Sequence, residues 1–358
     1  MNTAEVSDRQ PGGSSLESPS GTWIARSAST LATIGLSLVG LLAITFVIGR
    51  LLPADPVLAI VGDNASKDQY DQVFRQLHLD QPLWRQFAIY VDEILQGNFG
   101  QSRVTNDAVL NDILRFLPAT FELATIAIAI GVIAGVPLGM GCALHANRSF
   151  DHVGRVISLL GHSFPVFWLG LVGLLVFYSK LGWVEGPGRI GLAYQYTVPE
   201  VTKLLLVDTL LSGDMDAFRD AVSHIVLPSA ILGLAAIGYI TRMTRTFLLW
   251  QMRQDYVTVC RLKGLADFTI LWRHALPNTL GPIVAIIAMT YAHLLEGAVL
   301  TETVFAWPGL GLYITQSLFA SDLSPVLIGT LVIGAIFMLF NSLAELFQHL
   351  SDPRGARV

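Results

Sequence analysis

The sequence predicts an all-α integral membrane protein with six transmembrane helices. Of its 358 residues, 53% are hydrophobic and only 14% are charged, whereas soluble domains usually carry about 25% charged residues. The mean hydropathy is +0.57. Six apolar segments interrupt the chain, and each is long enough, at about 1.5 Å per residue, to cross the roughly 30 Å hydrocarbon core of a bilayer.

The spans are expected in chain order, with a polar segment after the first. Residues 1–21 are rich in Ser, Gly, Pro and Glu, which predicts a disordered tail. The first span, 28–50, has an apolar run too long for a signal peptide. Residues 51–116 carry apolar stripes on short helical pieces broken by Pro82 and Gly97, which predicts a small helical cap. The other five spans form a core over 117–347, before a tail at 348–358, and are expected at Leu117–Ala143, Val156–Leu181, Ile225–Leu248, Leu280–Leu300 and Val326–Phe347.

The charges of the loops predict which side of the membrane each loop occupies. The loop from Thr241 to Ala275 is basic, whereas the 51–116 and 182–222 segments are acidic, and the last loop has Glu302 and Asp322 without Lys or Arg. Cytoplasmic loops carry an excess of Lys and Arg. We therefore expect a multi-pass protein of the cell's inner membrane, with both termini in the cytoplasm. Arg242 and Arg245 are expected as anchors that extend to the membrane surface, with a structural link to the loop as the alternative.

The polar stretch from Gln254 to Asn278 divides into two short helical patterns. Gly264 suits the break between them because glycine adopts positive φ without steric cost. Asp267 is placed to cap the second helix, and Pro277 to stand in the first turn of the next span. An apolar stripe on such a pair of helices is a shape that docks into a groove of another protein, although a basic, amphipathic loop with no partner fits the pattern as well. The stripes are Tyr256, Val259, Cys260 and Lys263, then Phe268, Leu271, Trp272 and Ala275, with Arg273 and His274 at the end of the second helical pattern.

The sequence of this loop resembles that of the cytoplasmic loop of permease subunits in binding-protein-dependent ABC importers, in the dipeptide, oligopeptide and nickel branch. Gly264 holds the position of the family glycine, and Leu276 and Pro277 that of its Leu-Pro pair. The small-residue cluster before the glycine departs from the general pattern, since it reads Thr258, Val259 and Cys260 here. Further strings that match the branch are 50–57, 79–83, 96–100, 301–311 and 350–354.

The resemblance implies the six-helix fold of type I ABC importer permeases and a set of partners. These are a second, similar permease subunit, two cytoplasmic ATPase subunits, an extracytoplasmic solute-binding protein and the lipid membrane, with no nucleic acid. This chain would bind no cofactor, because ATP and magnesium belong to the ATPases. The 254–277 loop would seat in an ATPase groove through Tyr256, Cys260, Lys263, Gly264, Phe268, Leu271, Trp272, His274 and Pro277.

Charged side chains within the spans are candidates for the translocation path. A carboxylate at the bilayer centre costs roughly 2.5–3.5 kcal/mol on insertion scales, so Glu296 is expected to face protein or water. His293 lies three residues before it on the same helical face, and Glu122 is a third candidate. Pairing of Glu296 with a neighbouring subunit, or its solvation near the membrane surface, is the structural alternative.

Other small patterns have a structural interpretation. Gly131, Gly135 and Gly139 are spaced by four, which favours close helix packing over gating. Trp307 suits an anchor at the membrane interface. The two cysteines, Cys142 and Cys260, predict neither a disulfide framework nor a metal site.

Two other function classes are weakened by what the sequence lacks. It has no phosphate-binding G-x-x-x-x-G-K-[ST] and no H-E-x-x-H or G-x-S-x-G motif, so we expect a non-catalytic subunit. An intramembrane enzyme built on His293 and Glu296 would need a nucleophile or further metal ligands. An ion-driven secondary transporter is expected to show an internal repeat, and none is clear. The substrate stays open among dipeptides, longer peptides, nickel chelates and other small solutes, with peptides favoured.

Overall fold

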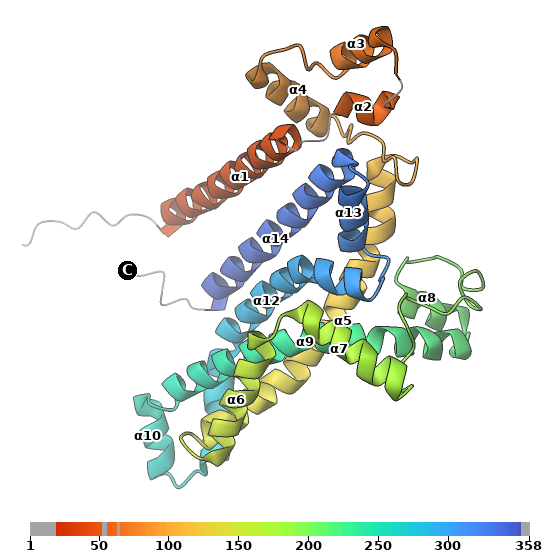
Figure 1. Cartoon of the computed structure of the whole chain (residues 1–358). Coiled ribbons are helices and arrows are strands. Elements are labelled where there is room, and N and C mark those ends of the chain that lie inside the picture. Colours follow the sequence, from red (N-terminus) through yellow and green to blue (C-terminus); the bar gives the residue numbers. More distant parts are fainter. Residues whose placement is uncertain (1–18, 52–55, 63–64, 352–358) are drawn as a thin grey trace, which may run out of the picture. The chain divides into compact units, whose positions relative to one another are not determined.

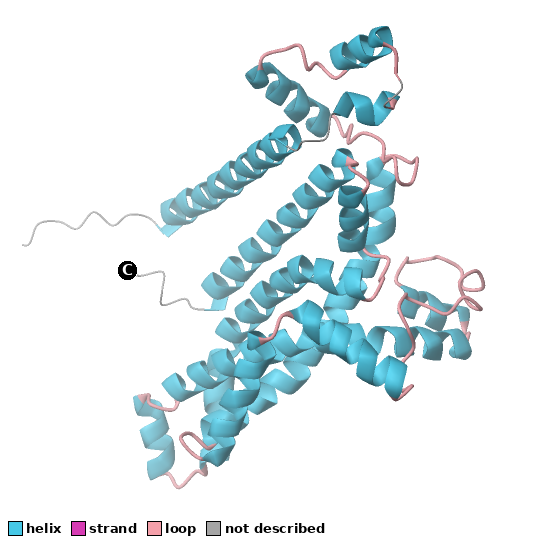
Figure 2. Ribbon diagram, in the orientation of Figure 1, coloured by secondary structure: helices cyan, strands magenta, loops and turns pink. Residues whose placement is uncertain are grey.

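A computed structural model describes residues 19–51, 56–62 and 65–351 of the chain. Of the tails expected at 1–21 and 348–358, residues 1–18 and 352–358 lie outside the described residues, as do 52–55 of the 50–57 string, and residues 348–351 belong to the last helix. Residues up to Gly40 and residues from Leu41 onward form two compact units. The described part of the chain is helical, without a strand, which confirms the all-α prediction (Figure 2).

The first unit holds most of one helix. Helix α1 covers Pro19–Leu51, and its apolar window is Ala32–Gly49. It therefore includes residues 19–21, which the sequence assigned to the tail. The elements that follow are α2 (Pro56–Val61), α3 (Lys67–Gln76), α4 (Leu83–Leu95), α5 (Val109–Leu144), α6 (Ser149–Ser163), α7 (Val166–Gly173), the π-helix η1 (Leu174–Lys180), α8 (Leu205–Ser212), α9 (Met215–Gln251), α10 (Asp255–Leu262), α11 (Asp267–Ile270), the π-helix η2 (Leu271–Ala275), α12 (Leu276–Val304), α13 (Leu310–Phe319) and α14 (Leu323–Ser351).

Five helices in the described residues are long and apolar enough to cross a membrane. They correspond to five of the six expected spans. The expected span at Val156–Leu181 is wrong as a single helix: it is divided into α6 and the shorter apolar run Val166–Lys180. Phe164, with φ −92° and ψ 136°, is extended at the break. The following residue, Pro165, disfavours a helical conformation for the residue before it, which accounts for the interruption.

The core is built by α5, α9 and α12, which pack against one another (Figure 1). Glycines set the closest approach between α5 and α9. A Cβ atom at Gly131 would lie 2.6 Å from the Cβ of Ala236, and one at Gly139 would lie 2.8 Å from the backbone oxygen of Thr241. Both distances are too short for a real contact, so the packing role expected for the glycine stripe is confirmed.

The cap expected over 51–116 forms as short helices. Helix α3 begins with a capping box, in which Ser66 and Gln69 each accept the other's backbone N–H. Asp322, at the start of α14, accepts hydrogen bonds from the Ser102 hydroxyl at 3.0 Å and from the backbone N–H of Arg103. This buried carboxylate, which the sequence analysis counted among the charges of the last loop, therefore joins the end of the cap to the core.

Candidate functional site

The 254–277 loop folds as two short helical pieces that meet at a glycine. Gly264 has φ +78°, in the left-handed region that favours glycine. The N–H of Leu265 reaches back to the carbonyl of Cys260 at 3.2 Å, which closes the end of α10. Pro277 stands in the first turn of α12, directly after the π-helix η2. The predicted helix, glycine, helix arrangement is confirmed, but the second piece is not a separate short helix, because it continues through η2 into α12 as one helix from Asp267 to Val304.

One side of this loop is fixed in the core. Val257, Ile270, Leu271 and Ala275 are fully buried. Leu271 and Ala275 belong to a cluster with Leu248 of α9 and Met140 of α5, so the loop is seated on the ends of both core helices. At roughly 1.5–3 kcal/mol for each large buried apolar side chain, this packing is enough to hold the loop in one position.

The other side of the loop leaves large apolar side chains exposed. Phe268 is 62% exposed and Trp272 is 55% exposed. The predicted second stripe is therefore split, because Leu271 and Ala275 face inward while Phe268 and Trp272 face outward. The exposed apolar set on the loop consists of Val259, Leu262, Leu265, Phe268 and Trp272.

The polar residues of the loop make mostly local contacts. The Tyr256 hydroxyl donates to Gln251 Oε1 at 3.0 Å, Lys263 ends α10, and Cys260 and His274 are half-buried. The cap expected at Asp267 is wrong. Ala266 is the N-cap residue and Asp267 is the first helical one, with its carboxylate 3.0 Å from Nε of Arg261. That pair ties the two helical pieces together across Gly264.

An ion pair behind the loop joins α6 to α9. Arg245 donates to both oxygens of the fully buried Asp151 carboxylate, at 2.6 and 2.8 Å. The Arg245 hydrogen bond, with help from the Asn147 N–H, holds the pKa of Asp151 at about 2, although burial opposes the shift. Arg245, with a side chain 20% exposed, thus links α9 to α6 and is not the surface anchor expected from the sequence. Arg242 is exposed, with its guanidinium over the ring of Tyr239.

Of the three candidates for the translocation path, Glu122 makes the best-defined hydrogen bonds. Its carboxylate accepts from Nε of Arg189 at 3.0 Å and from the backbone N–H of Leu206 at 2.7 Å. Both donors lie in the 185–222 insert, to which the sequence assigned no role. Arg189 also lies over the ring of Trp307. Glu122 is therefore an anchor for the insert, and no sequence pattern pointed to Arg189 as its partner.

His293 and Glu296 form a second, more open pair on α12. His293 Nδ1 lies 3.9 Å from a Glu296 oxygen, and the two side chains are 62% and 68% exposed in the single chain. The His293 ring packs edge-on against Phe337 of α14. The structure thus brings His293 and Glu296 together and leaves both side chains exposed. The third candidate, Glu122, lies apart from them, against the 185–222 insert.

The 301–311 segment is mostly buried and is hydrogen-bonded to α5, so it is not a surface turn. Trp307 is 1% exposed, and its indole N–H donates to the carbonyl of Ala119 at 2.9 Å, so the interfacial position expected for it is wrong. Glu302 is fully buried and accepts from the Thr120 hydroxyl at 2.6 Å and the Leu312 N–H at 3.0 Å. Sequence reasoning counted Glu302 as a loop charge; its partner Thr120 follows the Leu117-Pro118-Ala119 run of α5.

Within the described residues, no group of three His, Cys, Asp or Glu side chains is placed to hold a metal ion. Neither cysteine forms a disulfide, Cys142 being buried and Cys260 partly buried. The arrangement is thus a packed helical core with one partly exposed, apolar and basic loop.

Two comparisons, with protein families and with curated proteins, place the chain in one family. Residues 135–357 match the family described as binding-protein-dependent transport system inner membrane component, and residues 24–124 match the N-terminal region of such membrane components. The di/tripeptide transport system permease protein DppB of Pseudomonas aeruginosa is 37% identical over 88% of this chain and 94% of its own length. The probable D,D-dipeptide transport system permease protein DdpB of Escherichia coli is 38% identical over 90% and 95%. A solved structure of the MetNI methionine ABC transporter aligns with a TM-score of 0.49 and 16% identity, covering 67% of this chain and 96% of that one.

Proposed function

The chain belongs to the family of binding-protein-dependent transport system inner membrane components, and from this premise we propose that it is the permease subunit of an ATP-driven importer of short peptides. The support for the substrate is the set of relatives above, which carry dipeptide or di/tripeptide permease names at 37–38% identity over most of the chain. An importer of nickel or another small solute with the same architecture is the second candidate.

We propose that the 254–277 loop couples this permease to an ATPase. The observation that carries the proposal is the division of the loop into two sides. Leu271 and Ala275 fix it to the ends of α5 and α9, while Phe268 and Trp272 stay exposed. Exposed aromatic side chains are the residues in which binding surfaces concentrate their energy, so Phe268 and Trp272 can bind a partner. Because the loop is fixed to α5 and α9, a movement of that partner can pass to these helices.

The partners of the proposed complex are a second permease, two cytoplasmic ATPases and a solute-binding protein on the opposite side of the membrane. The basic loop faces the cytoplasm together with both termini, and the cap helices face outward. ATP and magnesium are held by the ATPases, and this chain performs no chemistry of its own. ATP-driven closure of the ATPases would move the loop, and through the α5 and α9 contacts would switch access to the path.

For the path itself, we propose that the exposed pair His293 and Glu296 lines it. A carboxylate that is 68% exposed in the single chain and lies within an apolar helix needs water, substrate or a neighbouring subunit around it. Replacing Glu296 by Gln would then reduce uptake of cationic peptides more than uptake of neutral ones. An equal effect on both would place Glu296 in a subunit contact instead.

The decisive experiment is uptake of a labelled dipeptide by cells with and without this gene, with its natural partner genes in place. We expect deletion to abolish uptake, the intact gene to restore it, and the Trp272→Asp form not to restore it. Unchanged dipeptide uptake after deletion would remove the peptide assignment, and labelled nickel uptake in the same strains would test the second candidate.

A further inference from the structure

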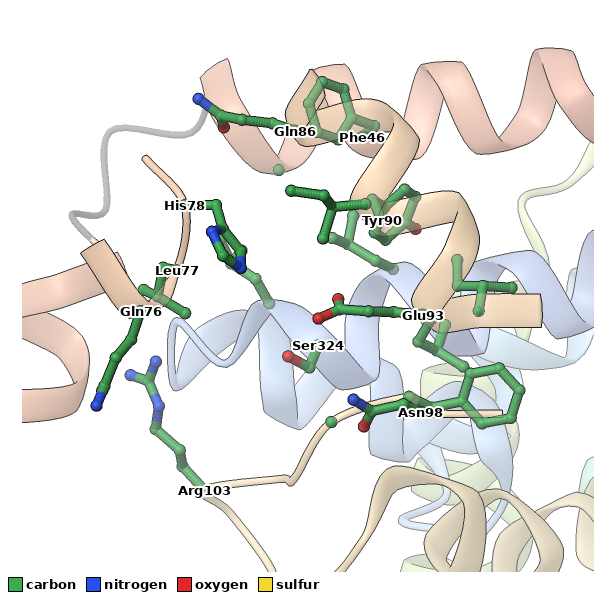
Figure 3. A pocket seen from close by; sticks show the side chains of 18 of the residues that line it. Phe46, Gln76, Leu77, His78, Gln86, Tyr90, Glu93, Asn98, Arg103 and Ser324 are labelled. Carbon is green, nitrogen blue, oxygen red and sulfur yellow. The ribbon is translucent and has the colours of Figure 1, made fainter. Parts of the chain in front are cut away.

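Two cavities in the described part of the chain differ in the charges on their walls. The larger, of about 340 Å³, lies between the cap helices α3 and α4 and the start of α14 (Figure 3). Glu93 and Arg103 both border it, and Figure 3 shows the guanidinium beside Gln76, away from the carboxylate, so these opposite charges select no single class of ligand. The smaller, of about 210 Å³, lies where α6 packs against α5 and α9, and its charged lining residues are all arginines.

Three arginines border the smaller cavity beside a single carboxylate. Nε of Arg245 lies 2.6 Å from Oδ1 of Asp151, and Nε of Arg155 lies 3.9 Å from the same oxygen, so these two guanidinium groups converge. Arg242 lies three residues before Arg245 on α9. Its guanidinium lies over the ring of Tyr239, and it pairs with no carboxylate of the described residues. Three positive charges beside one negative charge leave the cavity with an excess of positive charge.

The shape of the cavity is fixed by close helix packing. A Cβ atom at Gly238 of α9 would lie 2.6 Å from the backbone oxygen of Ser158 in α6, so the two helices are in direct backbone contact there. The hydroxyls of Ser158, Ser163 and Thr241 also border the cavity, and each donates to a backbone carbonyl. The charged donors left for a ligand are therefore guanidinium nitrogens that Asp151 does not use. Guanidinium groups bind phosphate and carboxylate through paired N–H donors, which makes the ligand an anion.

The cavity opens beside an apolar face of α6. Leu159 lines the cavity and is 63% exposed. Val156 and Val153 precede it at intervals of three residues, on the same side of the helix, and are also exposed. An anion that carries hydrocarbon chains can therefore place its charge in the cavity and its chains along α6.

The position of the cavity along the helices matches that of a lipid headgroup. Arg155 lies six positions after Ser149, the first residue of α6, and Arg245 lies six positions before Gln251, the last residue of α9. These two helix ends lie on the side of the 254–277 loop, which is the cytoplasmic side in the orientation proposed above. Basic pockets between membrane helices on that side bind the headgroups of anionic lipids.

We propose that this cavity is a binding site for a phosphate group, held by Arg155 and Arg242. Arg245 takes a smaller part because two of its nitrogens already bind Asp151. The two sources of such a group are an anionic phospholipid of the cytoplasmic leaflet and free phosphate. The exposed apolar face of α6 beside the cavity favours the lipid. The inference goes beyond the proposed transport function and shares with it only the orientation in the membrane.

The test uses the full chain, purified with the subunits that copurify with it and stripped of lipid by detergent exchange. Native mass spectrometry measures the binding of dioleoylphosphatidylglycerol and of zwitterionic dioleoylphosphatidylcholine, which has the same chains. Equilibrium dialysis measures the binding of labelled inorganic phosphate. Tighter binding of the anionic lipid, which we expect, would identify the lipid as the source. Saturable binding of inorganic phosphate without a preference between the lipids would identify free phosphate.

Substitutions assign the binding to this cavity. Arg155→Gln and Arg242→Gln each remove one charge and should each weaken binding about fivefold, the scale of the attraction between one basic side chain and an anionic lipid surface. Arg242→Lys keeps the charge and should lose less. The matched control is Arg148→Gln, at an exposed arginine directly before α6 that does not border the cavity. It should bind like the unaltered chain. All variants keep the Arg245–Asp151 pair, and their melting temperatures verify that they fold.

Two results would overturn the proposal. One is equal binding of the two lipids together with no saturable binding of inorganic phosphate, which is also the result expected if another subunit covers the cavity. The other is the same affinity in Arg155→Gln, Arg242→Gln and the control, which would place the bound probe elsewhere on the protein. Neither measurement involves uptake or ATP hydrolysis, so either result would leave the proposed transport function standing.

Discussion

Arg245 of α9 binds both carboxylate oxygens of Asp151 in α6, at 2.6 and 2.8 Å, and the Asp151 side chain is fully buried. Arg245 lies six positions before Gln251, the last residue of α9, after which the 254–277 loop begins. The pair therefore fixes α6 against the part of α9 that leads into the loop. A bidentate arrangement of this kind gives geometric precision as well as energy.

Removal of the carboxylate charge from this pair should destabilise the fold. In Asp151→Asn the Arg245 guanidinium loses its buried partner, and breaking a buried pair costs roughly 3–5 kcal/mol of unfolding free energy. The measurement is denaturant or thermal unfolding of the purified chain in detergent. The control is Asp216→Asn: the Arg219–Asp216 pair is 3.6 Å long and both side chains are largely exposed, so that change should cost about 0–1 kcal/mol. Equal losses would show that Arg245 is satisfied without Asp151.

The same pair predicts a dependence of stability on pH. The pKa of Asp151 falls from 3.8 to about 2 in the folded chain. A carboxyl group whose pKa is lowered on folding contributes stability that is fully present above about pH 4 and is lost as the pH falls through about 2. For this shift the contribution to the unfolding free energy is roughly 2 kcal/mol. Comparison of acid unfolding between the unaltered chain and Asp151→Asn isolates this contribution. The difference in stability should shrink in the acid range, and a constant difference between pH 5 and pH 2 would contradict the assignment.

Two adjacent residues separate folding from docking in the coupling loop. Trp272 is 55% exposed, so Trp272→Asp should leave the folded amount and the melting temperature of the permease close to normal while ATP-dependent uptake falls by about tenfold or more. Leu271 is fully buried, so Leu271→Asp should instead destabilise the chain itself. Expression level and uptake, measured together, distinguish the two effects.

A matched control for Trp272→Asp is Phe319→Asp. Phe319 is 83% exposed at the end of α13, away from the loop. A comparable loss of uptake in this variant would show that any new surface charge is harmful. The docking interpretation would then fail.

The fold was largely predictable because long apolar runs leave few alternatives in a bilayer. In the 254–277 loop, the break at Gly264 and the position of Pro277 were predictable because the backbone preferences of glycine and proline are local. The prediction of one helix over Val156–Leu181 was wrong because it used hydropathy alone, which does not take account of the effect of Pro165 on the backbone of Phe164. The roles of Trp307, Glu302 and Glu122 could not be read from the sequence, since their partners Ala119, Thr120 and Arg189 lie 67 to 188 residues away.

The insert at 185–222 should be released when its anchor is removed. Arg189→Met keeps an unbranched apolar stem and removes the hydrogen bonds to Glu122 and to the carbonyl of Lys203. Limited proteolysis of the purified chain should then cut within the insert faster than in the unaltered chain, because local opening governs cleavage. Glu122→Gln should act in the same direction. The control, Arg219→Met, alters an exposed arginine outside the anchor. Unchanged cleavage in both anchor variants would mean that the other contacts of the insert, such as the backbone bond from Gly188 to Phe305 and the bond from Lys203 Nζ to the carbonyl of Leu114, hold it without the anchor.

The contact between α5 and α9 should tolerate no added methyl group at Gly139. Its Cβ would lie 2.8 Å from both the Thr241 backbone oxygen and the Thr244 Cβ, and backbone cannot move aside as a flexible side chain can. Gly139→Ala should therefore force the helices apart and cost about 1–3 kcal/mol of unfolding free energy. Gly297→Ala is the control: the Cβ would meet only Leu232, at 3.9 Å. Since alanine favours helix over glycine by up to about 1 kcal/mol, that variant should be neutral or slightly more stable. If both variants unfold alike, helix propensity and not the approach of α5 to α9 governs this contact.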